Sequence, residues 1–224
     1  INTALGPAFI ETLIMVGLSG LATVALGLPL GVLLFVTEPG GLLQPRPANA
    51  AVRWLAIGLT SAVPGSVNIV RSIPYAILMV TLIPFTRALA GTSIGPIAAS
   101  VSLTVASVPF FARLVQAALR EVQPGKVDAA HAMGSTRFQT IRKVLLPEAL
   151  PSLTAGVTTT VVALIGYSAM AGLVGGGGLG RLAYNYGYQR YQPDVMVVVL
   201  IVLVLLVLLV QVTGDAIVRR VDHR

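Results

Sequence analysis

Apolar residues dominate the chain in five long runs, each separated from the next by a stretch rich in charge, proline or glycine. A membrane-spanning helix needs about 20 consecutive, mostly apolar residues. Five runs approach or exceed this length, and they lie at about residues 7–36, 66–89, 94–114, 153–174 and 193–216. The pattern therefore predicts an all-α membrane protein with five transmembrane helices.

The stretch between the first two spans does not fit a further crossing. Thr37–Ala50 combines three prolines and two glycines without periodicity, which is typical of a loop. Ala51–Val63 is apolar but holds only 13 residues, so we predict an interfacial or re-entrant segment there. Pro74 and Pro84 fall inside the second span, where neighbouring helices can satisfy the carbonyl groups that a proline leaves free.

The first span carries a possible packing signal. Gly27 and Gly31 form a G-x-x-x-G pair, which would let another helix approach closely. Glycine is also simply common in membrane helices. The sequence leaves both interpretations open.

Composition agrees with a membrane protein. The 224 residues are 55% hydrophobic and only 10% charged, whereas soluble domains carry about a quarter charged residues. The net charge is +7, but the cations lie between apolar runs rather than among aromatic residues. They therefore favour an anionic membrane surface over nucleic acid as the partner. The chain has no cysteine, which excludes disulfide scaffolds and thiol nucleophiles.

The cations also predict an orientation. Six Lys or Arg residues fall between residues 113 and 152 and three in the C-terminal tail, whereas the loops predicted on the other side hold three. Cytoplasmic loops carry the excess of Lys and Arg, so the C-terminus is predicted in the cytoplasm and the N-terminus outside. Arg71 lies near the start of the second span, where we expect it to reach the interface rather than act in a gate.

The most charged segment predicts two short helices joined by a glycine. Pro124 suits a first helical position, and Asp128 is expected in the first turn of the helix that follows. Gly134 would end that helix, and Thr136-x-x-Gln139 is a capping box that would start the next. One apolar face is expected on the second helix: Phe138, Ile141 and Leu145.

A spaced motif runs through this segment. D-A-A at Asp128–Ala130, Gly134, and V-x-L-P at Val144–Pro147 resemble the E-A-A-x3-G-x9-I-x-L-P loop of ABC importer permeases, with Asp for Glu and Val for Ile. The resemblance implies that the cytoplasmic segment 115–152 docks on a separate ATPase. The coupling residues it implies are Asp128, Ala129, Ala130, His131, Ala132, Met133, Gly134, Val144, Leu146 and Pro147. The alternative is a generic amphipathic loop.

Other stretches are similar to permeases of methionine importers: residues 68–75, 83–95, 144–153, 166–180 and 186–196. This resemblance implies a type I importer permease domain over residues 9–211 in the bacterial inner membrane. The implied partners are a second copy of the chain, two ATP-binding cassette subunits and an extracytoplasmic binding protein. L- and D-methionine are the implied substrates. Another small amino acid or related solute stays open, as does, less favoured, an ATPase-independent secondary transporter.

The sequence contains no phosphate-binding G-x-x-x-x-G-K-[ST] motif. We therefore expect ATP and Mg to bind to the partner ATPase, with no cofactor, metal or enzymatic activity on this chain. Gly175–Gly180 matches G-x-G-x-x-G, but it follows a membrane span and not a β-strand. We predict a flexible extracytoplasmic turn there. His131 and His223 are isolated, which does not suggest a metal site.

The fourth span offers polar side chains for a translocation pathway. Hydroxyl groups can pair with the polar ends of a zwitterion, and methionine suits an apolar thioether. The candidate pathway or gate residues are Thr159, Tyr167, Ser168 and Met170. The alternative is helix–helix hydrogen bonding, which is common for Ser and Thr in membranes.

Overall fold

Four helices in the computed structural model, which describes residues 2–38 and 62–222, are long and apolar enough to cross a membrane. They are α1 (Asn2–Val36), α5 (Pro96–Arg120), α9 (Leu150–Leu173) and α11 (Pro193–Val221). The helix Ala62–Ser72 and α3 (Tyr75–Thr81) make a fifth crossing if this bent pair counts as one span. The predicted loop 37–50 and interfacial segment 51–63 lie mostly outside the described residues.

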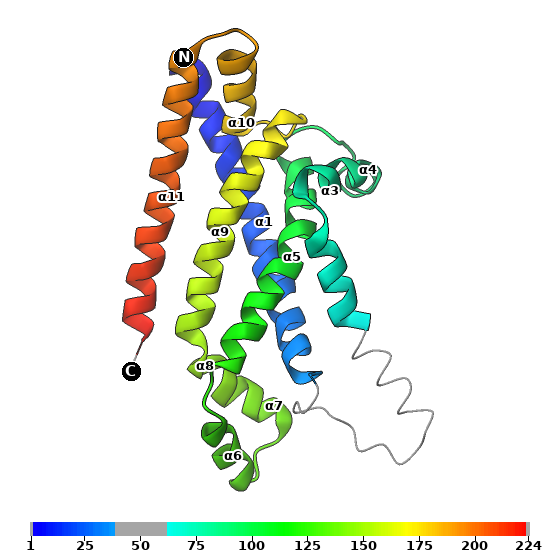
Figure 1. The fold of residues 1–224 in the computed structure, drawn as a ribbon, viewed down its shortest axis with the longest axis vertical. Coiled ribbons are helices and arrows are strands. Elements are labelled where there is room, and N and C mark those ends of the chain that lie inside the picture. Colours follow the sequence, from blue (N-terminus) through cyan, green and yellow to red (C-terminus); the bar gives the residue numbers. More distant parts are fainter. Residues whose placement is uncertain (1, 39–61, 223–224) are drawn as a thin grey trace.

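The long helices run side by side along one axis (Figure 1). At one end lie the start of α1, the short helix α10 (Gly178–Leu182) and the π-helical turn Ala183–Tyr188. At the other end lie α6 (Pro124–Ala132), α7 (Arg137–Thr140) and α8 (Leu146–Glu148). The N-terminus and the last described residues are at opposite ends, as an odd number of crossings requires.

The helix α1 packs closely on α5 through the two glycines of its G-x-x-x-G pair. A Cβ atom on Gly31 would lie 2.5 Å from Val115 Cβ and 2.6 Å from the Ala112 carbonyl oxygen. A Cβ atom on Gly27 would lie 2.8 Å from Phe111 Cδ1. Real Cβ atoms do not approach other atoms so closely, so the two backbones can meet only because both residues are glycine. Of the two interpretations left open by the sequence, close helix packing is confirmed.

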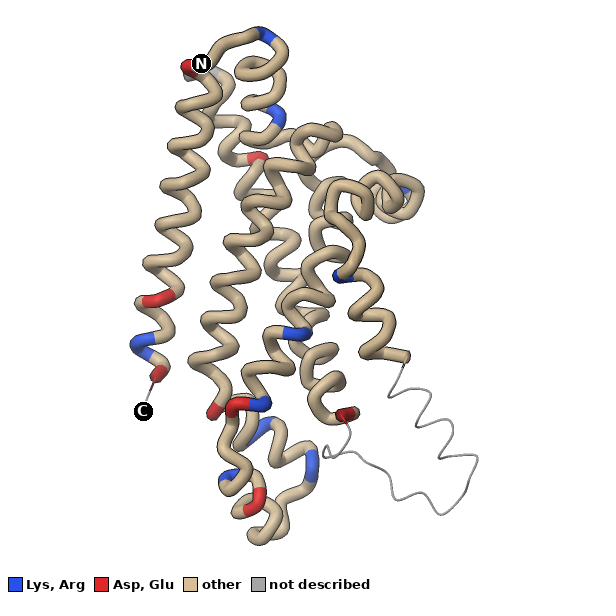
Figure 2. The backbone as a smooth tube through the Cα atoms, in the orientation of Figure 1, with Lys and Arg blue, Asp and Glu red and all other residues tan. Residues whose placement is uncertain are grey.

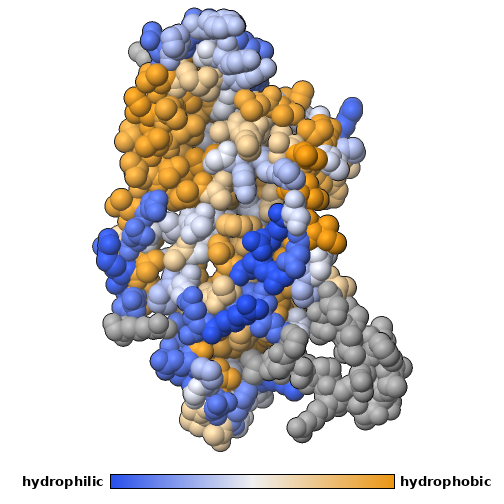
Figure 3. All heavy atoms as spheres, viewed as in Figure 1, coloured by the Kyte–Doolittle hydropathy of each residue, from blue (hydrophilic) through white to orange (hydrophobic). Residues whose placement is uncertain are grey.

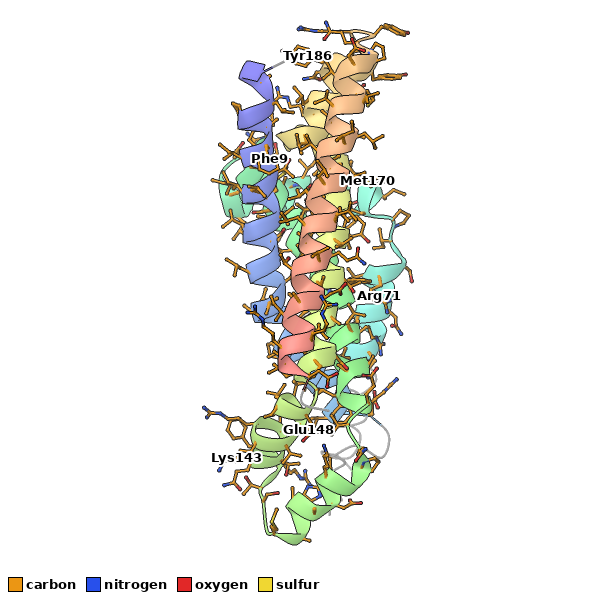
Figure 4. All side chains as sticks on the ribbon, turned by 90° about the vertical axis from the view of Figure 1, so that its left-hand side faces the viewer. Phe9, Arg71, Lys143, Glu148, Met170 and Tyr186 are labelled. Carbon is orange, nitrogen blue, oxygen red and sulfur yellow. The ribbon has the colours of Figure 1, made fainter. Side chains whose placement is uncertain are left out.

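The second span predicted at residues 66–89 is not one continuous helix. The chain bends by 104° between the helix Ala62–Ser72 and α3, and α4 (Ile83–Ala90) follows as a separate short helix. Pro74 has no N–H to donate and disfavours helical geometry in the preceding residue, which explains the break. The bend leaves Arg71 about midway along the bundle rather than at its end (Figure 4). The interfacial position expected for this arginine stays a prediction.

The glycine-rich segment after α9 is packed, not flexible. The Gly178 N–H donates to Glu11 Oε2 at 2.6 Å, and the Leu179 N–H donates to Thr12 Oγ1 at 2.9 Å. Both donors belong to the first turn of α10, whose N–H groups have no partner inside their own helix. Gly178 and Leu179 are buried. The flexible turn predicted for Gly175–Gly180 is therefore wrong, because α1 supplies acceptors that hold this segment in place.

We expect Thr12→Val to lower the stability of the folded chain. Valine keeps the shape of threonine but leaves the buried Leu179 N–H without an acceptor, which costs about 1–3 kcal/mol. The midpoint of thermal unfolding of the purified protein should fall accordingly. Thr213→Val is the matched control, because the exposed Thr213 hydroxyl bonds only to carbonyl groups of its own helix. Equal midpoints for the two variants would contradict this assignment.

The outer face of α11 is apolar and exposed. Leu200, Ile201, Leu205 and Leu209 are each more than half exposed. Orange spheres cover this helix over most of its length in Figure 3, which suits contact with lipid chains. Lys and Arg residues gather instead at the end of the bundle that carries α6 and α7 (Figure 2).

Candidate coupling elbow and translocation face

The two short helices joined by a glycine that the sequence predicts are confirmed at the end of the bundle that carries α6 and α7. We call the segment from α6 to α8 the elbow. Gly134 follows α6 with a φ of +78°, a conformation that glycine adopts without steric cost. Its N–H donates to the His131 carbonyl at 2.9 Å, and the Ser135 N–H donates to the Ala130 carbonyl at 3.1 Å. These two bonds form a Schellman motif. The first-turn position expected for Asp128 is wrong, because α6 already begins at Pro124.

The predicted capping box at the start of α7 is also confirmed. The Gln139 N–H donates to Thr136 Oγ1 at 3.3 Å, and the Thr136 N–H donates to Gln139 Oε1 at 2.9 Å. The helix α7 then passes into a π-helical stretch, Ile141–Leu145. Pro147, which cannot donate a backbone hydrogen bond, follows two residues after this stretch.

The apolar face predicted for the second helix is buried only in part. Leu145 is 1% exposed and Ile141 is half-buried, but Phe138 is 69% exposed. Phe138 therefore points away from the protein in a part of the chain that lies beyond the long helices. Large exposed apolar side chains of this kind favour a contact with another protein.

Most residues of α6 are also exposed. Ala130 is buried, and Met133, which caps the helix, is 82% exposed. We call the following exposed residues the elbow surface: Asp128, Ala129, His131, Ala132, Met133 and Gly134. This surface combines small side chains, which allow close approach, with one long apolar side chain, that of Met133, and one carboxylate, that of Asp128. Such a surface can hold a partner helix or cleft.

The second half of the motif anchors the elbow. Leu145 packs in one buried cluster with Phe111, Val115 and Leu119 of α5, and Leu146 packs against this cluster. An ion pair between Lys126 and Glu148 ties α6 to α8. Of the other motif residues, Val144 is half-buried and Pro147 is exposed.

The elbow is therefore fixed to the lower ends of α5 and α9, because Leu153 of α9 belongs to the same buried cluster. The Ser152 hydroxyl adds a hydrogen bond of 2.6 Å to Glu121, which immediately follows α5. A displacement of the elbow surface would move both long helices with it.

The candidate pathway residues on α9 separate into two groups. Thr159 and Met170 lie on one exposed stripe of the helix, together with Gly166. Ser168 is buried and its hydroxyl donates to the Ile165 carbonyl at 2.7 Å, so the structure turns it away from that stripe. Tyr167 is half-buried beside the stripe.

A tyrosine that the motifs did not single out joins this face. Tyr75, the first residue of α3, stacks on Tyr167 with ring centroids 4.9 Å apart and an interplanar angle of 23°. The Tyr75 hydroxyl lies 3.4 Å from Ser102 Oγ, and it donates to Met79 Sδ at 3.3 Å. The two rings are thus held together by side chains of α3 and α5. The sequence signals for Tyr75 were its position directly after the helix-breaking Pro74 and its place at the end of the resembling stretch 68–75.

Within residues 2–38 and 62–222, no three His, Asp or Glu side chains come together in a way that could hold a metal ion.

Known proteins share both the sequence and the arrangement of this chain. It is 51% identical over 214 residues to the probable D-methionine transport system permease protein MetI of Vibrio cholerae, which covers 96% of this chain and 90% of that protein. It is 44% identical over 192 residues to the methionine import system permease protein MetP of Bacillus subtilis, with coverages of 86% and 82%.

A solved inward-facing structure of the MetNI methionine ABC transporter superposes with a TM-score of 0.90 at 50% identity, covering 98% of this chain and 97% of that one. An amino acid ABC transporter chain at 18% identity shares the fold, with a TM-score of 0.74. The family described as binding-protein-dependent transport system inner membrane component matches residues 57–224. The chain therefore belongs to this family of inner membrane transport components.

Proposed function

We propose that the chain is the transmembrane permease of an ATP-driven importer, and that its substrate is methionine. The observation that carries this proposal is the elbow surface, an exposed docking surface fixed rigidly to two long helices. The similarity to permeases named for methionine transport supports the substrate. ATP and Mg would bind to the partner ATPase, since this chain lacks a phosphate-binding loop.

The elbow surface is the proposed contact with the ATPase. Met133 is a long apolar side chain with its surface largely free, which suits the centre of a protein interface. The small residues Ala129 and Ala132 leave room for a partner on either side. Leu146 acts differently, because it packs against the buried cluster and so holds the elbow on the bundle, and Val144 is half-buried.

Transport would follow if the permease has two conformations and the rigid contact between the elbow and the ATPase switches it from one to the other. When ATP closes the ATPase dimer, the elbow moves with it and tilts α5 and α9, and the pathway opens toward the binding protein. Hydrolysis of ATP then resets the assembly. A ligand shifts such an equilibrium only if its contacts differ between the two states. The buried cluster that joins the elbow to α5 and α9 supplies the mechanical link for that difference.

The orientation follows from the distribution of charge. Lys and Arg residues gather at the elbow end (Figure 2), which favours the cytoplasm for the elbow and the C-terminus. The N-terminus and α10 would then face the extracytoplasmic side, where a substrate-binding protein docks. The exposed stripe of α9 with Thr159 and Met170 would face a second copy of the chain, and residues 9–211 would form the permease domain.

Uptake by the reconstituted transporter tests this function. The chain is placed in lipid vesicles with its ATPase, and the matching binding protein is added on the side opposite the elbow. We expect ATP-dependent uptake of labelled methionine, and competition by unlabelled L- or D-methionine. Uptake that proceeds without the ATPase would favour a secondary transporter and contradict the proposal. Uptake of another amino acid that methionine does not inhibit would contradict the substrate alone.

A further inference from the structure

Arg71, an exposed arginine that bonds to none of the described residues, lies partway along the bundle beside the face assigned to the pathway. Arg71 belongs to the last turn of the helix Ala62–Ser72, about midway between Tyr186 at one end and Lys143 at the other (Figure 4). Its side chain is exposed, and no hydrogen bond or ion pair joins it to any residue of 2–38 or 62–222. A cation at membrane depth is costly, and where it persists it usually serves substrates or ions.

A cavity of about 120 Å³ opens beside this arginine. Four helical elements contribute to its walls: the helix Ala62–Ser72, α3, α5 and α9. The residues that line it include Arg71, Tyr75, Leu78, Ala106, Phe110 and Tyr167. One positive charge and two tyrosines thus line the cavity, together with aliphatic residues and Phe110.

The aromatic wall of the cavity joins α3 to α9. Tyr75 is 7% exposed, and its ring stacks on the ring of Tyr167, which lies beside the exposed stripe of α9. Because α3 and α9 are separate segments of the pathway face, a rigid shift of α9 would change the distance between the two rings. The shape of the cavity is therefore coupled to the helix that the elbow moves.

The cavity does not lie on the lipid-facing surface described above. Orange apolar spheres cover the upper part of α11 in Figure 3, whereas white and blue spheres lie among tan and orange ones in the middle of the same face. A polar strip along the middle of a membrane protein would be unfavourable against lipid chains. It suits a water-filled pathway between two copies of the chain.

We propose that Arg71 binds the α-carboxylate of the transported amino acid in this cavity, with the Tyr75–Tyr167 pair forming the wall for its side chain. This proposal rests on the proposed import of an amino acid, and it names the part of the substrate that the permease itself recognises.

The chemistry of the two groups fits. A guanidinium group presents a planar fork of donors that matches both oxygens of a carboxylate. The thioether of methionine makes favourable contacts with aromatic rings. One charged partner in an open cavity gives weak binding, as transport requires, because the substrate must also leave. Arg71 lies in the last turn of the helix Ala62–Ser72, where the helix dipole favours a positive charge.

Uptake by variants of Arg71 is the first test. Arg71→Gln removes the charge, and we expect methionine uptake to fall by about tenfold or more, as for the loss of a charge-assisted hydrogen bond. Arg71→Lys keeps the positive charge but loses the paired donors of the guanidinium group, so its uptake should lie between that of Arg71→Gln and that of the parent. Arg87→Gln is the matched control, because Arg87 is an exposed cation of the neighbouring α4 that does not line the cavity. It should transport as the parent does.

A labelling experiment tests binding at the cavity without changing Arg71. The chain has no cysteine, so Ala106→Cys places a single thiol in the cavity wall. In the assembled permease–ATPase complex without binding protein, L-methionine should slow the reaction of this thiol with a maleimide several-fold. Methioninol, which has an alcohol in place of the carboxylate, should not slow it. Protection by both compounds, or by neither, would overturn the assignment of the carboxylate to this site.

The outcomes separate this inference from the proposed function. If the parent transporter imports methionine but Arg71→Gln imports it equally well, only the carboxylate site fails. If the parent imports no methionine, the proposed substrate fails. Should Arg71→Gln not assemble with its ATPase, the labelling experiment still decides the question, because it leaves the arginine in place.

Discussion

Gly31→Ala is expected to destabilise the folded chain by about 2 kcal/mol, and Gly31→Leu to prevent its accumulation in the membrane. The reason is the contact of α1 with α5. The added Cβ atom would lie 2.5 Å from Val115 Cβ and 2.6 Å from the Ala112 carbonyl oxygen, so the two backbones must separate. Separation would also loosen the buried cluster at Phe111 on which the elbow rests. Thermal unfolding of the purified protein, and its yield in the membrane fraction, measure the effect.

Gly17 provides the matched control on the same helix. A Cβ atom on Gly17 would meet no atom within 4 Å, and alanine is a better helix former than glycine by about 0.5–1 kcal/mol. Gly17→Ala should therefore leave the stability unchanged or raise it slightly. If Gly31→Ala and Gly17→Ala unfolded at the same temperature, close helix packing would not be what makes Gly31 necessary.

The elbow could be predicted from the sequence because its signals are local. Pro124, Gly134 and the Thr136–Gln139 box each act on residues within one helical turn, and all three take the roles that their chemistry favours. The helix break after Ser72 was not predicted. A proline inside a span is compatible with either a continuous or a broken helix, and the neighbouring helices decide which forms.

Contacts between distant segments could not be predicted from one sequence. The hydrogen bond from Gly178 to Glu11 joins positions 167 residues apart, and nothing in either residue type predicts that the two would meet. The stacking of Tyr75 on Tyr167 depends in the same way on how α3 and α9 meet. The glycines of α1 were ambiguous for a related reason, since the pattern shows that a helix could approach but does not identify α5.

For the candidate site, the sequence predicted the residue types of the pathway better than their directions. The hydroxyl groups of Thr159 and Ser168 look equivalent along the chain, but only Thr159 reaches the exposed stripe of α9. The nine residues that separate them correspond to about half a turn beyond two full turns of helix, which places them on different faces. For Arg71 the sequence did not predict the position along the bundle, because that position depends on the bend at Pro74.

Asp128→Lys is expected to weaken the retention of the ATPase on the permease by about tenfold or more. Asp128 is an exposed carboxylate on the elbow surface, so in the proposed interface it faces a complementary group of the ATPase, and reversing its charge replaces attraction by repulsion. The folded permease should not change, because Asp128 makes no ion pair within the described residues.

The measurement is the amount of ATPase that co-purifies with the tagged permease, together with methionine uptake per ATP hydrolysed. Asp194→Lys is the control, since it makes the same exchange at an exposed carboxylate in the first turn of α11, at the opposite end of the bundle. Asp194→Lys should retain the ATPase fully. Because the elbow is the only route proposed here from ATP to α5 and α9, an Asp128→Lys complex with undiminished ATP-driven uptake would require the coupling contact to lie elsewhere on the chain.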